Sequence, residues 1–294
     1  MTDRTVSRIV RVRASHWVGD GFLVRPIFGD LAFTAVPSPF LMLDWAAPHT
    51  FPPSDTPRGV GVHPHRGFET VTIVYDGEIE HRDSAGHAGR IGPGDVQWMT
   101  AGAGILHEEK HGTAFSERGG TVSMAQLWVN LPAAAKATPP RYQSIAAAAI
   151  PTVTAAGGRF RVIAGALEDP TGTRHHGPAE TFSPLAVWDG RLAPEERFTA
   201  PIEPGWTVMV VVLDGAATIG GRRIGTAEMA LLTNDGERIT VIDAGESSHL
   251  LVLSGRPIDE SIAHYGPFVM NSREELFTAI DDFRNGKMGD LVES

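Results

Sequence analysis

Short runs of β-branched and other apolar residues alternate with glycine- and proline-rich turns along most of this chain. The clearest runs are VTIVY (71–75), MAQLWVNL (124–131), TVMVVVL (207–213), ERITVID (237–243) and HLLVLSG (249–255). Short strands punctuated by regular turn signals are typical of β-sandwiches and β-barrels. The pattern therefore predicts an all-β protein.

One segment near the end of the chain has helical periodicity instead. Ser272 and Glu275 form a capping-box pattern, and Asn285-Gly286 is a suitable helix stop. Apolar residues between them recur at helical spacing, at Leu276, Phe277, Ile280 and Phe283. We expect one amphipathic C-terminal helix over residues 272–285.

The chain also shows signs of an internal duplication. A strand, an Asp-Gly turn and a second strand occur in ETVTIVYDGEIEHRDSAG (69–86) and again in TVMVVVLDGAATIGG (207–221). The segment between the copies is rich in Ala and Pro and poor in large apolar residues, which indicates a linker. We expect an N-terminal domain (1–132), a linker (133–151), a second domain (152–266) and a helical tail (267–294) that packs back on the domains.

Composition narrows the possible chemistry. The chain has no cysteine, so disulfides, thiolate metal sites and cysteine nucleophiles are excluded, and any metal must bind to nitrogen and oxygen. A formal charge of −10 argues against a nucleic-acid partner. The sequence has neither an apolar signal-peptide stretch at its start nor a run long enough to span a membrane. We therefore expect a cytoplasmic protein.

Two histidine-containing pairs carry the candidate chemistry. In a strand, residues i and i+2 share a face with their Cα atoms about 6.5 Å apart, so His63 and His65 of the His-Pro-His segment can converge on one ion. The same argument places His107 and Glu109 on one face, after the glycine-rich turn at 101–106. The two pairs bracket one strand–turn–strand unit, which predicts a mononuclear transition-metal site.

Two further carboxylates lie near these pairs in the sequence. Glu108 points away from His107 because adjacent strand residues face opposite sides. Glu69, on the strand that follows the His-Pro-His segment, could approach the ion. By contrast, we expect the polar residues of the first hairpin to have surface roles; these are His81, Asp83 and His87.

The segment from HPHRG to GILHEE (63–109) resembles the first domain of the pirin family, a branch of the cupins, and YGPFVMNSREELFTAIDDFRNGKMG (265–289) resembles the C-terminus of that family. The resemblance implies two tandem cupin barrels of the double-stranded β-helix, jelly-roll type, with one metal in the N-terminal barrel. It also implies that the metal ligands are His63, His65, His107 and Glu109. The general cupin pattern would use Glu69, which we expect nearby but not as a ligand. Iron(II) is the expected metal, with Mn, Cu, Ni, Co and Zn open.

The second copy lacks a comparable site. Aligning LDG (213–215) on YDG (75–77) puts Pro201 and Glu203 at the positions of His63 and His65. No His-x-His occurs in this half, so we expect the C-terminal barrel to be without metal. Its histidines are interpreted as structural or solvent-facing; these are His175, His176, His249 and, beyond the barrel, His264.

Three imidazoles and one carboxylate would leave one or two coordination positions open, as catalytic metal sites require. The resemblance implies a quercetin 2,3-dioxygenase type of enzyme that opens a flavonol ring with O2 and releases CO. The base that removes the flavonol 3-hydroxyl proton would then be Glu109, Glu69 or Glu108.

Two other functions fit the same residues. One is a non-catalytic, iron-dependent redox sensor that acts through a protein partner, and the other is a purely structural metal. A catalytic site needs a cavity of about 300 Å³ or more over the open side of the metal, which distinguishes these functions. We expect a small aromatic substrate such as a flavonol, and a monomer.

Overall fold

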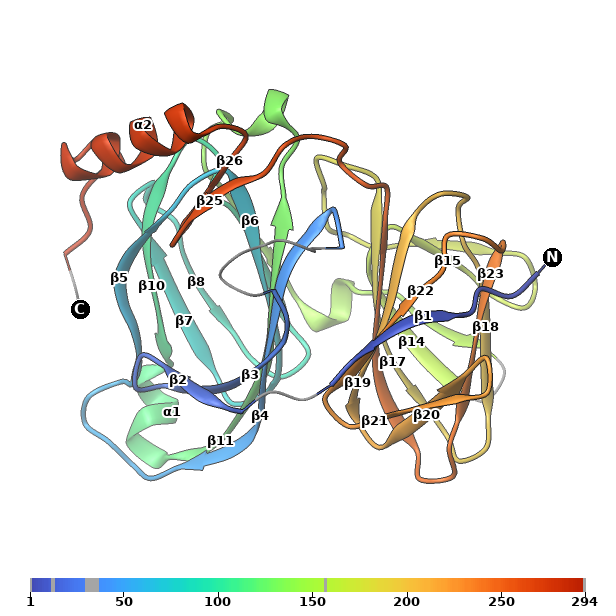
Figure 1. Cartoon of the computed structure of the whole chain (residues 1–294). Coiled ribbons are helices and arrows are strands. Elements are labelled where there is room, and N and C mark those ends of the chain that lie inside the picture. The colour runs from blue at the N-terminus through green and yellow to red at the C-terminus, as the bar shows by residue number, and fades with distance from the viewer. Residues whose placement is uncertain (1, 12–13, 30–36, 156–157, 293–294) are drawn as a thin grey trace. The chain divides into compact units, whose positions relative to one another are not determined.

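The computed structural model describes residues 2–11, 14–29, 37–155 and 158–292 (Figure 1). Antiparallel strands dominate these residues, as the hydrophobic pattern predicts. The helices among them are α1 (Thr113–Arg118), α2 (Arg273–Arg284) and the short 3-10 turns η1 (Ala133–Ala135) and η2 (Ala147–Ala149). Within this part of the chain, no helix is long and apolar enough to cross a membrane.

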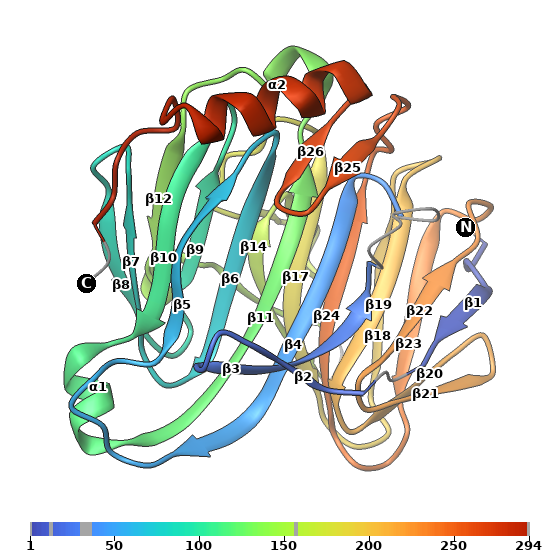
Figure 2. The ribbon, with the colours of Figure 1, turned by 60° about the vertical axis from the view of Figure 1, so that its left-hand side comes forward.

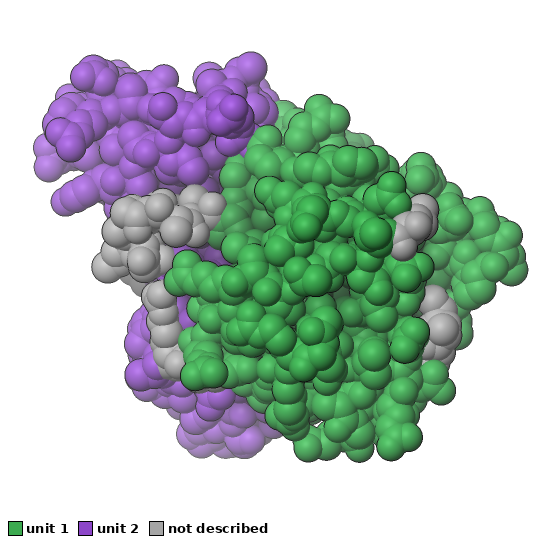
Figure 3. Space-filling model, turned by 45° about the vertical axis from the view of Figure 1, so that its right-hand side comes forward, with its two compact units in different colours: residues 1–13, 37–39, 148–257 green, residues 14–36, 40–147, 258–294 purple. Residues whose placement is uncertain are grey.

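The chain folds into two compact units, which Figure 3 colours separately. Unit 1 contains Met1–Arg13, Pro37–Pro39 and Ala148–Pro257, and unit 2 contains Ala14–Val36, Phe40–Ala147 and Ile258–Ser294. The start of the chain therefore belongs to the unit built from the second half, and the C-terminal tail belongs to the unit built from the first half. The domain bounds expected from the sequence, 1–132 and 152–266 among them, therefore remain a prediction.

Unit 2 consists of a seven-stranded and a four-stranded sheet. The larger sheet has the order β12 (Arg141–Ile145), β9 (Val96–Thr100), β6 (Phe68–Asp76), β11 (Gly120–Asn130), β4 (Phe40–Phe51), β3 (Phe22–Phe28), β2 (His16–Val18). The smaller sheet has the order β5 (Gly59–His65), β10 (Ile105–His111), β7 (Ile79–Asp83), β8 (Ala88–Ile91). A separate hairpin contains β25 (Ala263–Tyr265) and β26 (Phe268–Met270).

Unit 1 repeats this arrangement. Its larger sheet has the order β1 (Val6–Val10), β22 (Glu228–Leu232), β19 (Thr207–Asp214), β24 (Ser248–Gly255), β17 (Leu185–Leu192), β14 (Gly158–Ala164), β13 (Thr152–Ala155). Its smaller sheet has the order β18 (Arg197–Pro201), β23 (Arg238–Asp243), β20 (Ala216–Ile219), β21 (Arg222–Gly225). A separate hairpin contains β15 (Ala166–Glu168) and β16 (Arg174–His176).

The strand orders of the two units match position by position, so the duplication inferred from the sequence extends to the topology. From β5 to β11 in unit 2 and from β18 to β24 in unit 1, equivalent strands follow in the same chain order. The edge strand differs: β12 comes directly after the barrel strands of unit 2, whereas β1 comes from the start of the chain and lies beside β22 (Figure 1).

The interiors of the two units differ in polarity. Unit 1 has one large apolar cluster, in which Phe160 stacks on Phe198 with ring centroids 3.7 Å apart. In unit 2 the corresponding apolar cluster, which includes Phe22 and Phe115, fills only part of the interior. Buried polar side chains occupy another part of it, among them His107 and Glu109. This polar region is where a site can form.

Helix α2 begins at the predicted capping box, with the Ser272 side chain accepting from the Glu275 backbone N–H and the Glu275 side chain accepting from the backbone N–H of Ser272. Its buried face is set by Leu276 and Ala279. Phe277, which the periodicity placed on this face, is 66% exposed, because it directly follows Leu276 and adjacent helix residues do not share a face. Figure 2 shows α2 beside β26, with which it shares an apolar cluster.

Candidate metal centre

The three histidines converge because β5 and β10 pair in antiparallel register. His107 lies opposite His63, and Ile105 lies opposite His65. The ring centroid of His107 is 4.2 Å from that of His63 and 4.8 Å from that of His65, and the His63 and His65 rings are also 4.8 Å apart. Their ligand nitrogens all lie within 4.8 Å of one another. His63 and His65 of the first pair and His107 of the second thus form one triad.

The hydrogen bonding of the triad fits a metal ion. Nδ1 of His65 and Nε2 of His107 are buried and have no hydrogen-bond partner. Nδ1 of His63 lies 2.8 Å from the carbonyl oxygen of Gly61, which leaves Nε2 of that ring as the metal-facing nitrogen. Buried polar atoms without partners are rare and costly. Coordination to a transition metal would satisfy both nitrogens.

The electrostatics of the triad also suit a metal. Burial, together with the charge of His63, holds the pKa of His65 well below its usual range, although a hydrogen bond with the Pro267 carbonyl opposes this shift. Burial, with the charges of His63, His65 and His81, likewise holds the pKa of His107 well below its usual range. Both rings are therefore neutral near pH 7 and keep the lone pairs that coordination requires.

Glu109 forms a second group, with His81 and His107, whose ligand atoms also lie within 4.8 Å of one another. The β10 register shifts between His107 and Glu109, so Glu109 lies opposite Val60. His107 thus belongs to both groups, and Glu109 is 7% exposed. The complete set of four ligands suggested by the resemblance remains a proposal.

The Glu109 carboxylate is held by neighbours from the larger sheet. Its Oε1 accepts hydrogen bonds from Gln97 Nε2 at 2.8 Å and from Thr72 Oγ1 at 3.2 Å. Thr72 is the direct cross-strand partner of both Gln97 and Gln126, and Gln126 is the direct partner of Asp44. These residues form a polar row across the inner face of the sheet, a feature that the sequence analysis did not anticipate.

Asp44 ends this row. It is 9% exposed, and its Oδ1 is buried and has no hydrogen-bond partner. Burial raises the pKa of Asp44 to about 6, although the charge of His16 opposes the shift. No motif marks this residue. It is found only when the strands β4 and β11 are placed side by side.

His81 and Asp83 correct the expectation of surface roles for the first hairpin. His81 is 1% exposed and Asp83 3% exposed. The His81 ring stacks on Tyr142 with centroids 4.8 Å apart, its Nδ1 lies 3.4 Å from Nδ1 of His107, and its Nε2 lies 3.2 Å from Asp83 Oδ2. Ile79, His81 and Asp83 are two residues apart and therefore share one face of the strand. This spacing, beginning with an apolar residue, could have predicted their burial from the sequence. His87, by contrast, is only half-buried and contacts Asp83.

Glu69 does not join the histidines. Its register with β9 is regular from Glu69 to Ile73. Because Glu69 is three residues from Thr72, it lies on the opposite face of β6 from the residues that hold Glu109. There it accepts a 2.7 Å hydrogen bond from Thr100 Oγ1, and burial raises its pKa to about 7. The structure thus sets Glu69 apart from the histidines, which makes it a poor candidate for the base.

Glu108 points away from His107, as strand alternation predicted, but it is buried rather than solvated. Its carboxylate accepts from Nε of Arg82 at 2.8 Å and lies 3.3 Å from Nζ of Lys110. These two cations satisfy the carboxylate, and strand alternation puts it on the face away from the triad. It too is a poor candidate for a base.

The equivalent positions of unit 1 do not form a comparable group. Over the described residues, both groups able to hold a metal lie in unit 2. In unit 1, His249 Nε2 lies 2.6 Å from Asp189 Oδ1, and His175 Nε2 lies 3.0 Å from Asp169 Oδ2. These histidines have carboxylate partners, as structural residues do.

Two barrels of matching topology, one of which brings together histidine and carboxylate side chains that could hold a metal, define a two-barrel protein of the cupin class. The family model for Pirin matches residues 22–129, and the model for the Pirin C-terminal cupin domain matches residues 187–289. The chain belongs to the pirin family, and the predicted tandem cupin fold is confirmed.

Curated relatives and solved structures agree with this assignment. A Pseudomonas aeruginosa protein, named provisionally as a quercetin 2,3-dioxygenase, is 54% identical over 92% of this chain and 94% of its own. Human pirin is 37% identical over 79% of each chain. The crystal structure of a quercetin 2,3-dioxygenase from Acinetobacter baumannii is 46% identical, covers 99% of this chain and 100% of its own, and gives a TM-score of 0.93.

Proposed function

We propose that this protein is a metal-dependent dioxygenase that opens the ring of a flavonol such as quercetin with O2 and releases CO. The observation that carries the proposal is the convergence of three imidazoles with two unpartnered buried nitrogens, on His65 and His107. The names of the P. aeruginosa relative and the A. baumannii structure support the choice of substrate.

The proposed ligands are His63, His65, His107 and Glu109, with iron(II) as the metal and Mn, Cu, Ni, Co or Zn as other possible occupants. When bound, the metal would supply the Lewis-acid and redox chemistry that brings a flavonol and O2 to reaction. The chain supplies neutral imidazoles to hold it. It also supplies the base: Glu109, oriented by Gln97 and Thr72, would take the proton from the flavonol 3-hydroxyl.

Oxygen uptake by the Fe(II)-reconstituted protein in the presence of quercetin tests this proposal. We expect uptake matched by flavonol loss and CO release, and we expect His107→Ala to abolish it. The matched control is His264→Ala, since His264 is a partly exposed histidine of the same unit and its Nε2 lies 2.9 Å from the carbonyl oxygen of Gly266. No uptake from protein that carries one iron per chain would contradict the dioxygenase function.

A redox regulator is the second candidate, and burial favours it. His65, His107 and Glu109 are each less than a tenth exposed. In this function, oxidation of the iron would change the binding of a protein partner without turnover. Stoichiometric iron with no oxygen uptake, together with partner binding that changes with oxidation state, would support it. Zinc with four protein ligands and no water would instead indicate a structural metal.

A further inference from the structure

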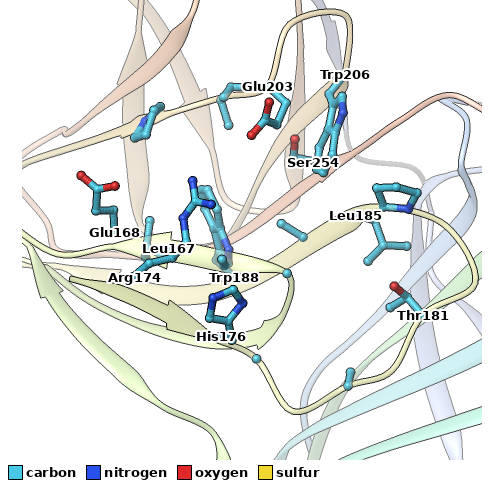
Figure 4. A pocket seen from close by; sticks show the side chains of 18 of the residues that line it. Leu167, Glu168, Arg174, His176, Thr181, Leu185, Trp188, Glu203, Trp206 and Ser254 are labelled. Carbon is cyan, nitrogen blue, oxygen red and sulfur yellow. The ribbon is translucent and has the colours of Figure 1, made fainter. Parts of the chain in front are cut away.

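Unit 1 contains a cavity of about 670 Å³. Figure 4 shows the side chains of the β15–β16 hairpin on one side of it, including Leu167 and Arg174, and those of the turn after β18 on another, including Glu203 and Trp206. Its volume lies within the range of small-molecule sites, about 300–1,000 Å³. It therefore has room for a small organic ligand.

The position of the cavity in the barrel follows from the duplication. Strand β18 of unit 1 is topologically equivalent to β5 of unit 2, which carries His63 and His65. Pro201 and Glu203, which align with those two histidines, line the cavity. The cavity thus occupies the place in unit 1 that the histidine triad occupies in unit 2.

Two buried polar atoms at the cavity have no hydrogen-bond partner. They are Nε1 of Trp188, a residue 3% exposed, and Oγ of Ser254, a residue 1% exposed. Ser254 lies directly opposite Ala186, two residues from Trp188, so both side chains are on the same face of the sheet. An indole N–H only donates and a hydroxyl can donate, so both atoms call for a ligand that accepts hydrogen bonds.

The remaining lining residues indicate the charge and shape of the ligand. Three exposed carboxylates, Glu168, Glu203 and Glu237, outnumber the single arginine, Arg174, which disfavours anionic ligands. The walls are apolar or aromatic, with Leu167, Leu185 and Trp206 beside Trp188. Such walls favour a planar apolar body.

Arg4 braces the side of the cavity formed by the turn after β18. This arginine is 1% exposed, and its guanidinium donates to the carbonyl oxygens of Trp206 at 2.6 Å, Glu203 at 3.1 Å and Gly236 at 3.2 Å. The Arg4 side chain thus holds the turn 203–206 through the carbonyl oxygens of Glu203 and Trp206, and the cavity wall is fixed before any ligand binds. Pre-organisation of this kind lowers the cost of binding.

We propose that unit 1 binds an uncharged, planar aromatic molecule that carries a hydrogen-bond acceptor, with Trp188 and Ser254 as the polar anchors. The site is separate from the histidine triad and needs no metal. It uses the cupin position at which the sequence has replaced the histidines by Pro201 and Glu203.

Calorimetric titration of the full, metal-free chain with naphthalene-2-carboxamide, and with the isosteric anion 2-naphthoate, tests the proposal. We expect the amide to bind with a Kd of about 10–100 μM and the anion about tenfold more weakly or not at all. Trp188→Phe keeps the aromatic wall and removes the donor, and should weaken amide binding about five- to tenfold. Ser254→Ala should weaken it by a similar factor, and serves as an independent check if Trp188→Phe disturbs folding.

His107→Ala is the matched control, because it disables the triad and should leave amide binding unchanged. This control separates the present proposal from the dioxygenase function. Oxygen uptake can fail while amide binding persists, and amide binding can fail while oxygen uptake persists. Stronger binding of 2-naphthoate than of the amide would overturn the proposed ligand class. No amide binding up to millimolar concentration, or binding that depends on His107 but not on Trp188 or Ser254, would overturn the site itself.

Discussion

The two barrels share a strand order but differ in the side chains at equivalent positions of the smaller sheet. Unit 2 places His63 and His65 on β5, whereas unit 1 places Pro201 and Glu203 at the aligned positions. The first pair helps to form a nitrogen-rich group, and the second lines a cavity with apolar walls. One topology therefore presents two different sets of side chains at equivalent positions, and the chemistry depends on those side chains rather than on the fold.

Their buried carboxylates differ in the same way. Burial raises the pKa of Glu69 in unit 2 to about 7. In unit 1, burial acts to raise the pKa of Asp189, but the hydrogen bond from His249 and the charges of His249 and Arg161 outweigh it, and the pKa is lowered. Glu69 of unit 2 is therefore buried at a cost to stability, whereas Asp189 of unit 1 is paired with cationic partners.

The largest expected effect concerns metal binding. His107→Ala should lower the metal affinity of the whole chain by at least about 100-fold, because His107 belongs to both candidate groups in unit 2. Metal titration with elemental analysis measures this. His175→Ala, which removes a histidine of unit 1, should leave the affinity unchanged. A loss of metal in the His175 variant would show that the contrast between the barrels is wrong.

Next in size is the buried ion pair of unit 1. Asp189→Asn should reduce the free energy of unfolding by about 3 kcal/mol at pH 7, because it leaves Arg161 and His249 without their carboxylate. The lowered folded-state pKa means that the wild-type stabilisation is present above the unfolded-state pKa and is lost as pH falls through the folded-state value. The difference between the two proteins should therefore shrink in acid. Denaturant unfolding at several pH values measures it, and a difference that grew on acidification would contradict the pairing.

The buried carboxyl of unit 2 should behave in the opposite sense. The pKa of Glu69 is raised from 4.5 to about 7, so the wild type loses stability as pH rises across that interval. Glu69→Gln should be more stable than wild type by about 2 kcal/mol at pH 8 and no more stable at pH 4. Thermal unfolding across this pH range measures the effect. Equal stability of the two proteins at pH 8 would mean that Glu69 is paired or solvated.

The smallest effect separates the two candidate groups within unit 2. His81→Phe keeps the ring that stacks on Tyr142 but removes the contact with Nδ1 of His107, and should weaken metal binding about tenfold. His63→Ala should weaken it by at least about 100-fold if His63 is a ligand. The reverse order of the two effects would place the metal on His81, His107 and Glu109 instead.

Local patterns in the sequence were enough for much of this protein. Alternation of apolar residues predicted the strands, the Ser272–Glu275 box predicted the start of α2, and the His-x-His spacing predicted a shared face for His63 and His65. These features depend on residues within a few positions of one another, where backbone periodicity alone fixes which side chains share a face. The repeated strand–turn–strand pattern likewise indicated two similar barrels.

Only the tertiary structure decided which distant residues meet. The burial of His81 against His107, the polar row from Gln97 to Asp44 and the removal of Glu69 to the other face of β6 all depend on register between strands far apart in the chain. One wall of the unit 1 cavity, the turn 203–206, is held by Arg4, about two hundred residues earlier in the chain. The physical reason is that register and side-chain packing are cooperative properties of the assembled sheets, whereas sequence periodicity reports only on each strand by itself.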